Sequence, residues 1–236
     1  MMKFHSTIST PLLTILGAAL LSSLVACGGG TSAASDSSGG SSTSTPSYGG
    51  GLTPGSVTMT ITNQVTLTTN YGTIVVGLDA THAPLSTANF LAYVTTGFYN
   101  GTLFHRVVPG FVIQGGGYID TNGTYSAKAT NASINLESRN GLSNTQYTIA
   151  MARVGGQPNS ATSQFYFNLV NNASSLDYPS TDNAGYAVFG AVSATDTTSI
   201  ATINAIAAVP NGTNSQLSAP NWPTTDVVII SAKQNY

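Results

Sequence analysis

The sequence predicts a mainly β protein, a closed antiparallel barrel capped by two α-helices. Three features carry this prediction. Several short segments alternate apolar and hydroxyl side chains, which is the period of a half-buried strand. Asn-Gly pairs at 100–101, 122–123, 140–141 and 211–212 are suited to turns with positive φ. Two further segments place apolar residues at helical spacing.

The predicted strands lie at both ends of the folded region. Alternating segments at 57–62, 65–68 and 73–78 open it. A final strand is predicted at 226–232. It is apolar enough for burial on both faces.

Two segments are predicted to be helices. The first begins at Pro84, because proline pre-sets φ in the first turn, and ends at Gly97. Its apolar stripe consists of Phe90, Leu91 and Val94. The second runs from Asp196, a candidate N-cap, to Val209. Its apolar stripe consists of Ile200, Ile203 and Ile206 or Ala207.

Residues 1–26 are predicted to be a secretory signal, because their apolar stretch at 11–21 is too short to span a bilayer comfortably. They end in Leu24-Val25-Ala26-Cys27, which resembles the lipobox of bacterial lipoproteins. This resemblance implies lipidation of Cys27 and a bacterial cell-envelope location, anchored in the outer membrane and facing the periplasm. A plain signal peptide with an incidental cysteine is the alternative.

Residues 27–56 are predicted to be a flexible tether that follows the lipidated cysteine. Their composition is dominated by Gly, Ser and Thr, from which no core can form. The folded domain is therefore expected at 57–236, which is long enough for one substantial core.

The composition excludes several function classes. Six Lys and Arg against eight Asp and Glu give a net charge of −2, so the basic surface needed for nucleic acid binding is missing. One Cys excludes an intrachain disulfide, and three His make a structural metal site improbable. We expect neither nucleic acid nor a metal as a partner.

A cation inside an apolar run marks the segment 104–117. If this segment is a regular strand, Phe104 and Arg106 share one face, and His105 and Val107 share the other. A guanidinium among apolar side chains must find acceptors or face a cleft. Taken alone, Arg106 could equally be a structural arginine and Gln114 a satisfied core amide.

Three blocks together resemble the cyclophilin family of peptidyl-prolyl isomerases, and most closely its exported bacterial branch. They are Phe-His-Arg through Gln-Gly-Gly at 104–117, Ile149 to Arg153 with Ser-Gln-Phe at 163–165, and Ala-Val-Phe-Gly at 187–190. The resemblance implies an eight-stranded barrel, a monomer, no cofactor, and proline-containing polypeptides as substrates.

The resemblance also assigns catalytic roles. It implies that Arg106 is the catalytic arginine, that Phe111 forms the floor of the proline pocket, and that Gln114 orients the arginine. The apolar wall would be completed by Val112, Tyr166 and Leu176, where the family usually has Met, Phe and Leu.

The remaining assignments concern the rim. Gln164 would help to hold the substrate backbone, and Ala152 and Arg153 would border the site through main-chain contacts. Tyr186 stands where many eukaryotic members have His, and His105 resembles a conformational support. Arg153 replaces a common Asn and is expected to add a cation at the rim.

One departure from the family pattern keeps two functions open. Ser175 stands where eukaryotic members have Trp and many bacterial members have Phe. The main hypothesis is an isomerase that assists the folding of exported proteins. The alternative is a membrane-tethered, non-catalytic proline-peptide binding module or holdase chaperone.

Overall fold

The computed structural model describes residues 51–180 and 184–236. The chain divides into two units, Met1–Pro46 and Ser47–Tyr236, and the described residues all belong to the second. The predicted signal, Cys27 and most of the predicted tether lie outside the described residues. Within the described part, none of the helices has the length and hydrophobicity needed to span a membrane.

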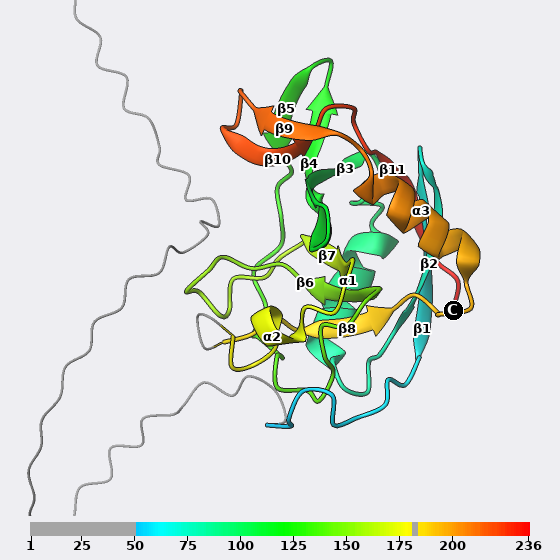
Figure 1. Cartoon of the computed structure of the whole chain (residues 1–236), viewed down its shortest axis with the longest axis vertical. Coiled ribbons are helices and arrows are strands. Elements are labelled where there is room, and N and C mark those ends of the chain that lie inside the picture. The colour runs from blue at the N-terminus through cyan, green and yellow to red at the C-terminus, as the bar shows by residue number, and fades with distance from the viewer. Residues whose placement is uncertain (1–50, 181–183) are drawn as a thin grey trace, which may run out of the picture. The chain divides into compact units, whose positions relative to one another are not determined.

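Eight antiparallel strands form a nearly closed barrel (Figure 1). In their order around it they are β11 (Ile229–Gln234), β1 (Asn63–Thr69), β2 (Gly72–Leu78), β8 (Val188–Ala191), β6 (Thr148–Met151), β7 (Phe165–Asn168), β4 (Val112–Thr121) and β3 (Thr102–Val108). An antiparallel bridge between Leu103 and Val228 joins β3 to the residue before β11. The predicted antiparallel barrel is therefore confirmed.

Two hairpins project beyond the barrel at the top of Figure 1. In the first, β5 (Thr124–Ala127) pairs with β4 after a turn in which Asn122 and Gly123 have φ values of 54° and 83°. The second pairs β9 (Asn211–Asn214) with β10 (Ala219–Pro223). The predicted turn at 211–212 is wrong, because both residues lie in β9 and pair with β10.

Both predicted helices are present. Helix α1 (Pro84–Thr95) is followed by Gly97, which has a φ of 67°. Helix α3 (Thr197–Ala207) begins after Asp196, whose carboxylate accepts a hydrogen bond from the Ser199 backbone N–H. Helix α1 contacts β8 and β11, whereas α3 contacts β2, β3 and β4. The sequence did not predict a third, one-turn helix, α2 (Ala173–Leu176).

Two strand predictions need correction. Residues 57–62 alternate like a strand but pair with no strand and remain largely exposed outside the barrel. The final strand begins at Ile229, three residues later than predicted, and its outer face is open. Ile230 there is 55% exposed, while Ile229 is fully buried. The first prediction is wrong because an alternating segment becomes a strand only when another strand pairs with it. The second is wrong because an apolar residue can remain on a solvent-exposed face of a sheet.

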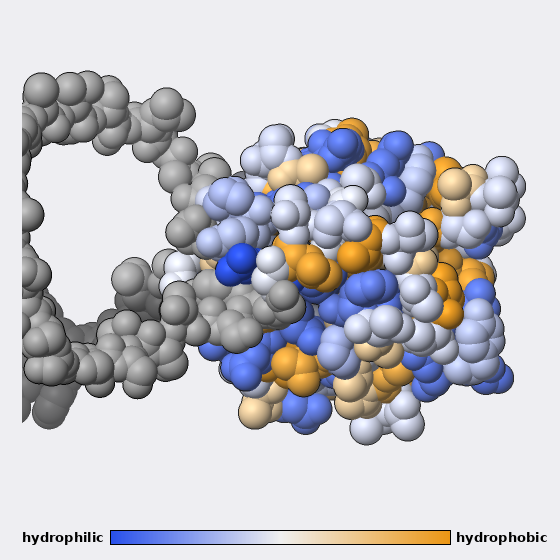
Figure 2. Space-filling view, turned by 90° about the horizontal axis from the view of Figure 1, so that it is seen from below, coloured by the Kyte–Doolittle hydropathy of each residue, from blue (hydrophilic) through white to orange (hydrophobic). Residues whose placement is uncertain are grey.

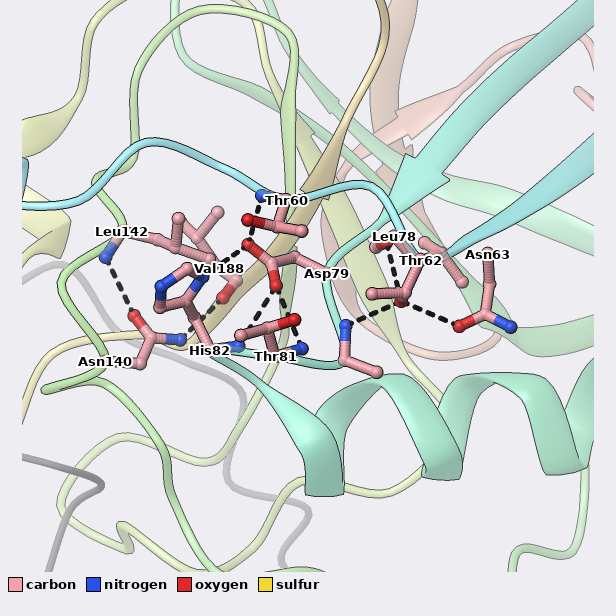
Figure 3. Close-up of polar contacts among 11 residues, drawn as sticks. Thr60, Thr62, Asn63, Leu78, Asp79, Thr81, His82, Asn140, Leu142 and Val188 are labelled. Carbon is pink, nitrogen blue, oxygen red and sulfur yellow. Dashed lines mark hydrogen bonds and ion pairs between the residues drawn. The ribbon is translucent and has the colours of Figure 1, made fainter.

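Residues 57–62 run beside the barrel and are held there by hydrogen bonds to the Asp79 carboxylate and to the Leu78 carbonyl (Figure 3). Asp79 is fully buried and accepts a hydrogen bond of 2.8 Å from the Thr60 N–H. Its other oxygen accepts from the Thr81 and His82 N–H groups, both at 3.0 Å. The Nδ1 atom of His82 lies 2.7 Å from Asp79 Oδ2, the oxygen that also accepts from Thr60. One side chain thus fixes both the entering segment and the approach to α1.

The barrel interior holds the main core. Strands β1 and β2 alternate buried and half-buried residues, as the sequence predicted. Phe90 of α1 packs against Phe165 and Phe189, with ring centroids 5.3 Å apart in both pairs. Figure 2 shows one face of the surface, where apolar residues are interspersed among hydrophilic ones. With the interior filled, a binding site must lie on the outer face.

Candidate functional site

An irregularity in β3 directs Arg106 away from the core. The pairing register of β3 with β4 shifts between Phe104 and Arg106, where three residues of β3 lie opposite two of β4. Phe104 and Val107 both belong to the main core, while His105 and Arg106 do not. The predicted face-sharing of Phe104 with Arg106 is therefore wrong. Such a bulge re-aims a side chain, and here it releases the arginine from the interior.

Register then places Arg106 at one end of a row that crosses five strands. Arg106 of β3 lies opposite Gln114 of β4, which lies opposite Tyr166 of β7. Tyr166 pairs in turn with Ala150 of β6, and Ala150 pairs with Val188 of β8. Residues that are directly opposite one another project from the same face of a sheet. The row is therefore a continuous outer surface with its cation at the β3 end.

A second apolar cluster covers this row. Its buried members are Val112, Leu142, Ala150, Tyr166, Leu176 and Val188. Half-buried members pack against it: Val57, Met59, Phe111, Ala152 and Tyr186. The apolar and aromatic residues predicted for the site all belong to this cluster, so separated stretches of sequence do meet in one place: Phe111, Val112, Ala152, Tyr166, Leu176 and Tyr186. Five members were not predicted as site residues: Val57, Met59, Leu142, Ala150 and Val188. The first three lie outside the family motifs, whereas Ala150 and Val188 lie within them.

Two glutamines connect the cluster to the arginine. Arg106 Nη1 lies 3.5 Å from Gln114 Oε1, which accepts its hydrogen bond. Gln114 Nε2 donates to Gln164 Oε1 at 2.8 Å. All three side chains are half-buried and keep access to solvent. Burial lowers the pKa of Arg106, and the nearby Tyr186 opposes that shift. An arginine remains charged despite such a shift, so the site presents a partly desolvated cation.

His105, which precedes Arg106 in β3, packs among aromatic side chains outside the apolar cluster. Its ring centroid is 4.7 Å from that of Tyr118 and 5.7 Å from that of Trp222. Burial lowers its pKa to about 4, and the Arg106 charge acts in the same direction. The ring is therefore neutral at pH 7 and packs as an aromatic. Trp222 of β10 also contacts Tyr118 edge-on, with ring centroids 5.5 Å apart.

Arg153 is placed differently from expectation. Its side chain is only 6% exposed, so the predicted cation at the rim is wrong. Arg153 Nε donates to the Gly185 carbonyl at 2.9 Å, and its guanidinium carbon lies 4.2 Å from the centre of the Tyr186 ring. The arginine thus holds the segment that carries Tyr186. The Ala152 N–H donates to the Gln164 carbonyl within the chain, and the predicted main-chain contact of Ala152 with a substrate stays a prediction.

Ser175 is exposed on α2, beside the buried Leu176. Within residues 51–180 and 184–236, no group of three or more His, Cys, Asp or Glu side chains is arranged to hold a metal ion. The site therefore offers a hydrogen-bond donor with a positive charge, two amides and an apolar surface. These features suit the binding of a neutral peptide that contains an apolar ring.

Comparison with known proteins agrees with this geometry. A sequence model of the cyclophilin type peptidyl-prolyl cis-trans isomerases matches residues 64–234. Peptidyl-prolyl cis-trans isomerase A of Dickeya dadantii is 50% identical over 133 residues, which cover 56% of this chain and 67% of that protein. A peptidyl-prolyl cis-trans isomerase of Acinetobacter baylyi is 46% identical over 169 residues, covering 72% and 84% of the two chains.

A solved structure supports the same relationship. The cyclophilin type isomerase of Cryptosporidium parvum, crystallised in the presence of the dipeptide Ala-Pro, is similar with a TM-score of 0.57 at 25% identity. The match covers 73% of this chain and 99% of that one. The chain therefore belongs to the cyclophilin-type peptidyl-prolyl cis-trans isomerase family, whose members are enzymes that bind proline-containing peptides and isomerise their prolyl bonds.

Proposed function

We propose that this isomerase acts on exported proteins and that Arg106 is its catalytic residue. The observation that carries the proposal is the bulge in β3, which places Arg106 at the edge of the outer apolar cluster and beside Gln114. A substrate proline ring seated on that cluster would bring its nitrogen toward the guanidinium. No covalent step is required.

The chemistry follows from the amide bond. Resonance gives the peptide C–N bond partial double-bond character and a rotation barrier of about 18–20 kcal/mol. In the twisted state the prolyl nitrogen becomes pyramidal and regains a lone pair that can accept a hydrogen bond. Arg106 would donate to that lone pair, which the planar ground state does not offer. A rate gain of about 10⁵ corresponds to about 7 kcal/mol of differential binding.

The surrounding residues would give this hydrogen bond its strength. Phe111, Val112, Tyr166 and Leu176 would hold the proline ring and exclude water. Gln114 would orient the guanidinium, while Gln164 would hold Gln114 and the substrate backbone. Donors fixed in a water-excluded site stabilise developing charge better than water does. Ala152, Arg153 and Tyr186 would form the remaining border, and His105 would support β3 from the far side.

Cis-to-trans exchange of a short Xaa-Pro peptide tests the catalytic role. The full chain should accelerate exchange, and Arg106→Ala should reduce kcat/KM by two orders of magnitude or more. Arg106→Lys keeps a charge but loses the planar fork, so it should recover only part of the rate. Lys233→Ala, at an exposed position on β11, is the matched control and should retain full activity. Retention of the parent rate by Arg106→Ala would refute the assignment.

The alternative is a tethered binding module or holdase without turnover. The observation that favours this alternative is Ser175, which is exposed and stands where the family has an aromatic residue. The same assay separates the two functions. Binding of the proline peptide by the parent without accelerated exchange would establish the binding module.

We further propose that Cys27 is lipidated and that the domain works at the periplasmic face of the outer membrane. The support is the lipobox-like sequence 24–27, with Gly28 rather than Asp after the cysteine. Cys27→Ser should move the protein from the membrane fraction to the soluble fraction of the cell envelope. A membrane distribution unchanged by this substitution would refute the anchor.

A further inference from the structure

A buried asparagine outside the predicted site makes hydrogen bonds to two of the pocket tyrosines. Asn144 lies in the loop before β6 and is fully buried. Its Oδ1 accepts from the Tyr166 hydroxyl at 2.8 Å and from Asn168 Nδ2 at 3.1 Å. Its Nδ2 donates to the Tyr186 carbonyl at 3.3 Å. The amide therefore contacts the side chain of one pocket residue and the backbone of another.

The same amide holds a buried carboxylate next to a third pocket residue. Asn144 Nδ2 and its backbone N–H both donate to Asp177 Oδ1 at 2.8 Å. The Ser143 hydroxyl donates to the other Asp177 oxygen. Asp177 directly follows Leu176, and only 8% of it is exposed. A carboxylate this buried needs several donors, and Asn144 supplies two of them.

A second branch reaches the floor of the pocket. Asn168, which donates to Asn144, accepts from Asn172 Nδ2 at 2.8 Å. Asn172 Nδ2 also donates to the Phe111 carbonyl at 2.9 Å. The Asn172 N–H donates to the Asn144 carbonyl at 2.9 Å. Four pocket residues are thus hydrogen-bonded to this network or adjacent to it: Phe111, Tyr166, Leu176 and Tyr186.

We propose that Asn144 is a positioning residue of the isomerase, which sets the proline pocket through the Tyr166 hydroxyl and the Tyr186 backbone. This inference rests on the proposed function, because it concerns the same pocket. Burial raises the pKa of Tyr166 well above its ordinary value, so the hydroxyl stays protonated and donates. A side-chain amide with both donors and both acceptor sites engaged has one preferred orientation. Small displacements of a pocket wall can cost large factors in rate.

Asn144→Asp tests the inference with almost no change in shape. The substitution replaces the Nδ2 donor with an oxygen that faces the Asp177 carboxylate. As the pH rises the pair loses the proton that it can share, and two facing carboxylates then repel each other and disturb Tyr166 and Tyr186. At pH 5 the pair can share a proton, which restores a hydrogen bond. We expect kcat/KM of the variant to lie at least tenfold below the parent at pH 8 and within about threefold of it at pH 5.

The control must show that this pH profile comes from the network. Asn214→Asp makes the same change at another buried asparagine, which lies in β9. Its Oδ1 accepts from the backbone N–H groups of Gln216 and Leu217, and an aspartate oxygen can accept both hydrogen bonds in the same way. It should follow the parent at every pH. Tyr166 interacts electrostatically with Tyr186, Asp177 and Arg153, and Tyr186 interacts with Arg106. The parent contains the same groups, so their titration is already part of the pH profile of the parent. Circular dichroism at 10 °C would confirm that each variant is folded at both pH values.

A double-mutant cycle tests the route through the hydroxyl. Tyr166→Phe removes only the donor to Asn144. If Asn144 acts through that donor, Asn144→Asp should reduce kcat/KM at least threefold less in the Tyr166→Phe background. Purely multiplicative effects of the two substitutions would overturn the proposal.

Other outcomes decide the question as well. A folded Asn144→Asp variant with parent-like kcat/KM at pH 8 would overturn the proposal while leaving the proposed function intact. If that variant is unfolded at pH 8, Asn144→Ser is measured instead, and parent-like activity there would overturn it equally. An inactive parent would refute the proposed function and this inference with it.

Discussion

The position of Arg153 predicts which of two similar arginines matters for stability. Its Nε donates to the Gly185 carbonyl at 2.9 Å, its Nη1 donates to the Val154 carbonyl at 3.3 Å, and its guanidinium stacks 4.2 Å from the Tyr186 ring centre. Lysine keeps the charge but has no planar guanidinium, so it cannot make both hydrogen bonds and stack on the ring at the same time. A buried hydrogen bond from a charged group contributes about 1.5–3 kcal/mol, and desolvated stacking adds to this. Arg153→Lys should lower the free energy of unfolding by about 2–3 kcal/mol.

Arg139 provides the matched control. It also lies over a tyrosine, with its guanidinium carbon 4.8 Å from the Tyr178 ring centre, but it is half-buried and donates to the Gly51 carbonyl at a long 3.4 Å. Arg139→Lys should therefore cost less than about 1 kcal/mol. Urea unfolding at pH 7 measures both variants, and the KM of Arg153→Lys should rise because Tyr186 loses its support. Equal losses in the two variants would refute this account of Arg153.

Three further predictions concern stability. Gly190→Ala places a Cβ 2.3 Å from the Gly77 carbonyl and should destabilise the barrel by about 3 kcal/mol or more, whereas Gly212→Ala meets no atom within 4 Å and should be neutral in the same urea titration. His105 has a folded pKa of about 4 against 6.5 when unfolded, so stability should fall as pH drops from 6.5 to 4. His105→Gln should flatten that slope in thermal melts, and an unchanged slope would exclude His105 as its source. Asp196→Ala removes the cap of α3 and should cost about 1 kcal/mol at pH 7, a loss that guanidinium unfolding would detect.

Local signals in the sequence were sufficient for the helices and most of the early strands. Asp196 marks a helix start because the first backbone N–H groups of a helix need a side-chain acceptor. Pro84 marks one because a proline in the first turn gives up no intrahelical hydrogen bond. The strands at 65–68 and 73–78 were predicted because each has one face toward the barrel interior. The segment 57–62 has the same pattern but was predicted wrongly, because its N–H groups donate singly to the Asp79 carboxylate and to the Gly141 and Leu78 carbonyls and form no strand ladder.

The site was only partly predictable for a physical reason. Motif resemblance named residues that do gather in the outer cluster, but it could not place their side chains. The bulge that turns Arg106 outward depends on one extra residue in β3 relative to β4, and the strand's own sequence does not encode that register. The burial of Arg153 depends on Gly185 and Tyr186, which lie more than thirty positions later. Asn144 carried no signal, because its partners meet only after folding.

The buried acids show how a chain with only 6% charged residues keeps such a site ordered. Glu137 accepts hydrogen bonds from the backbone N–H groups of Leu85 and Ser86, in the first turn of α1. Asp79 accepts from the backbone at the approach to that helix, and Asp177 accepts from Asn144 and Ser143. Each carboxylate satisfies several donors that would otherwise be buried without partners. Because backbone, amide and hydroxyl donors satisfy these carboxylates, no salt bridge is needed to hold Asp177 beside the pocket, and Arg106 is left as the half-buried cation of the site.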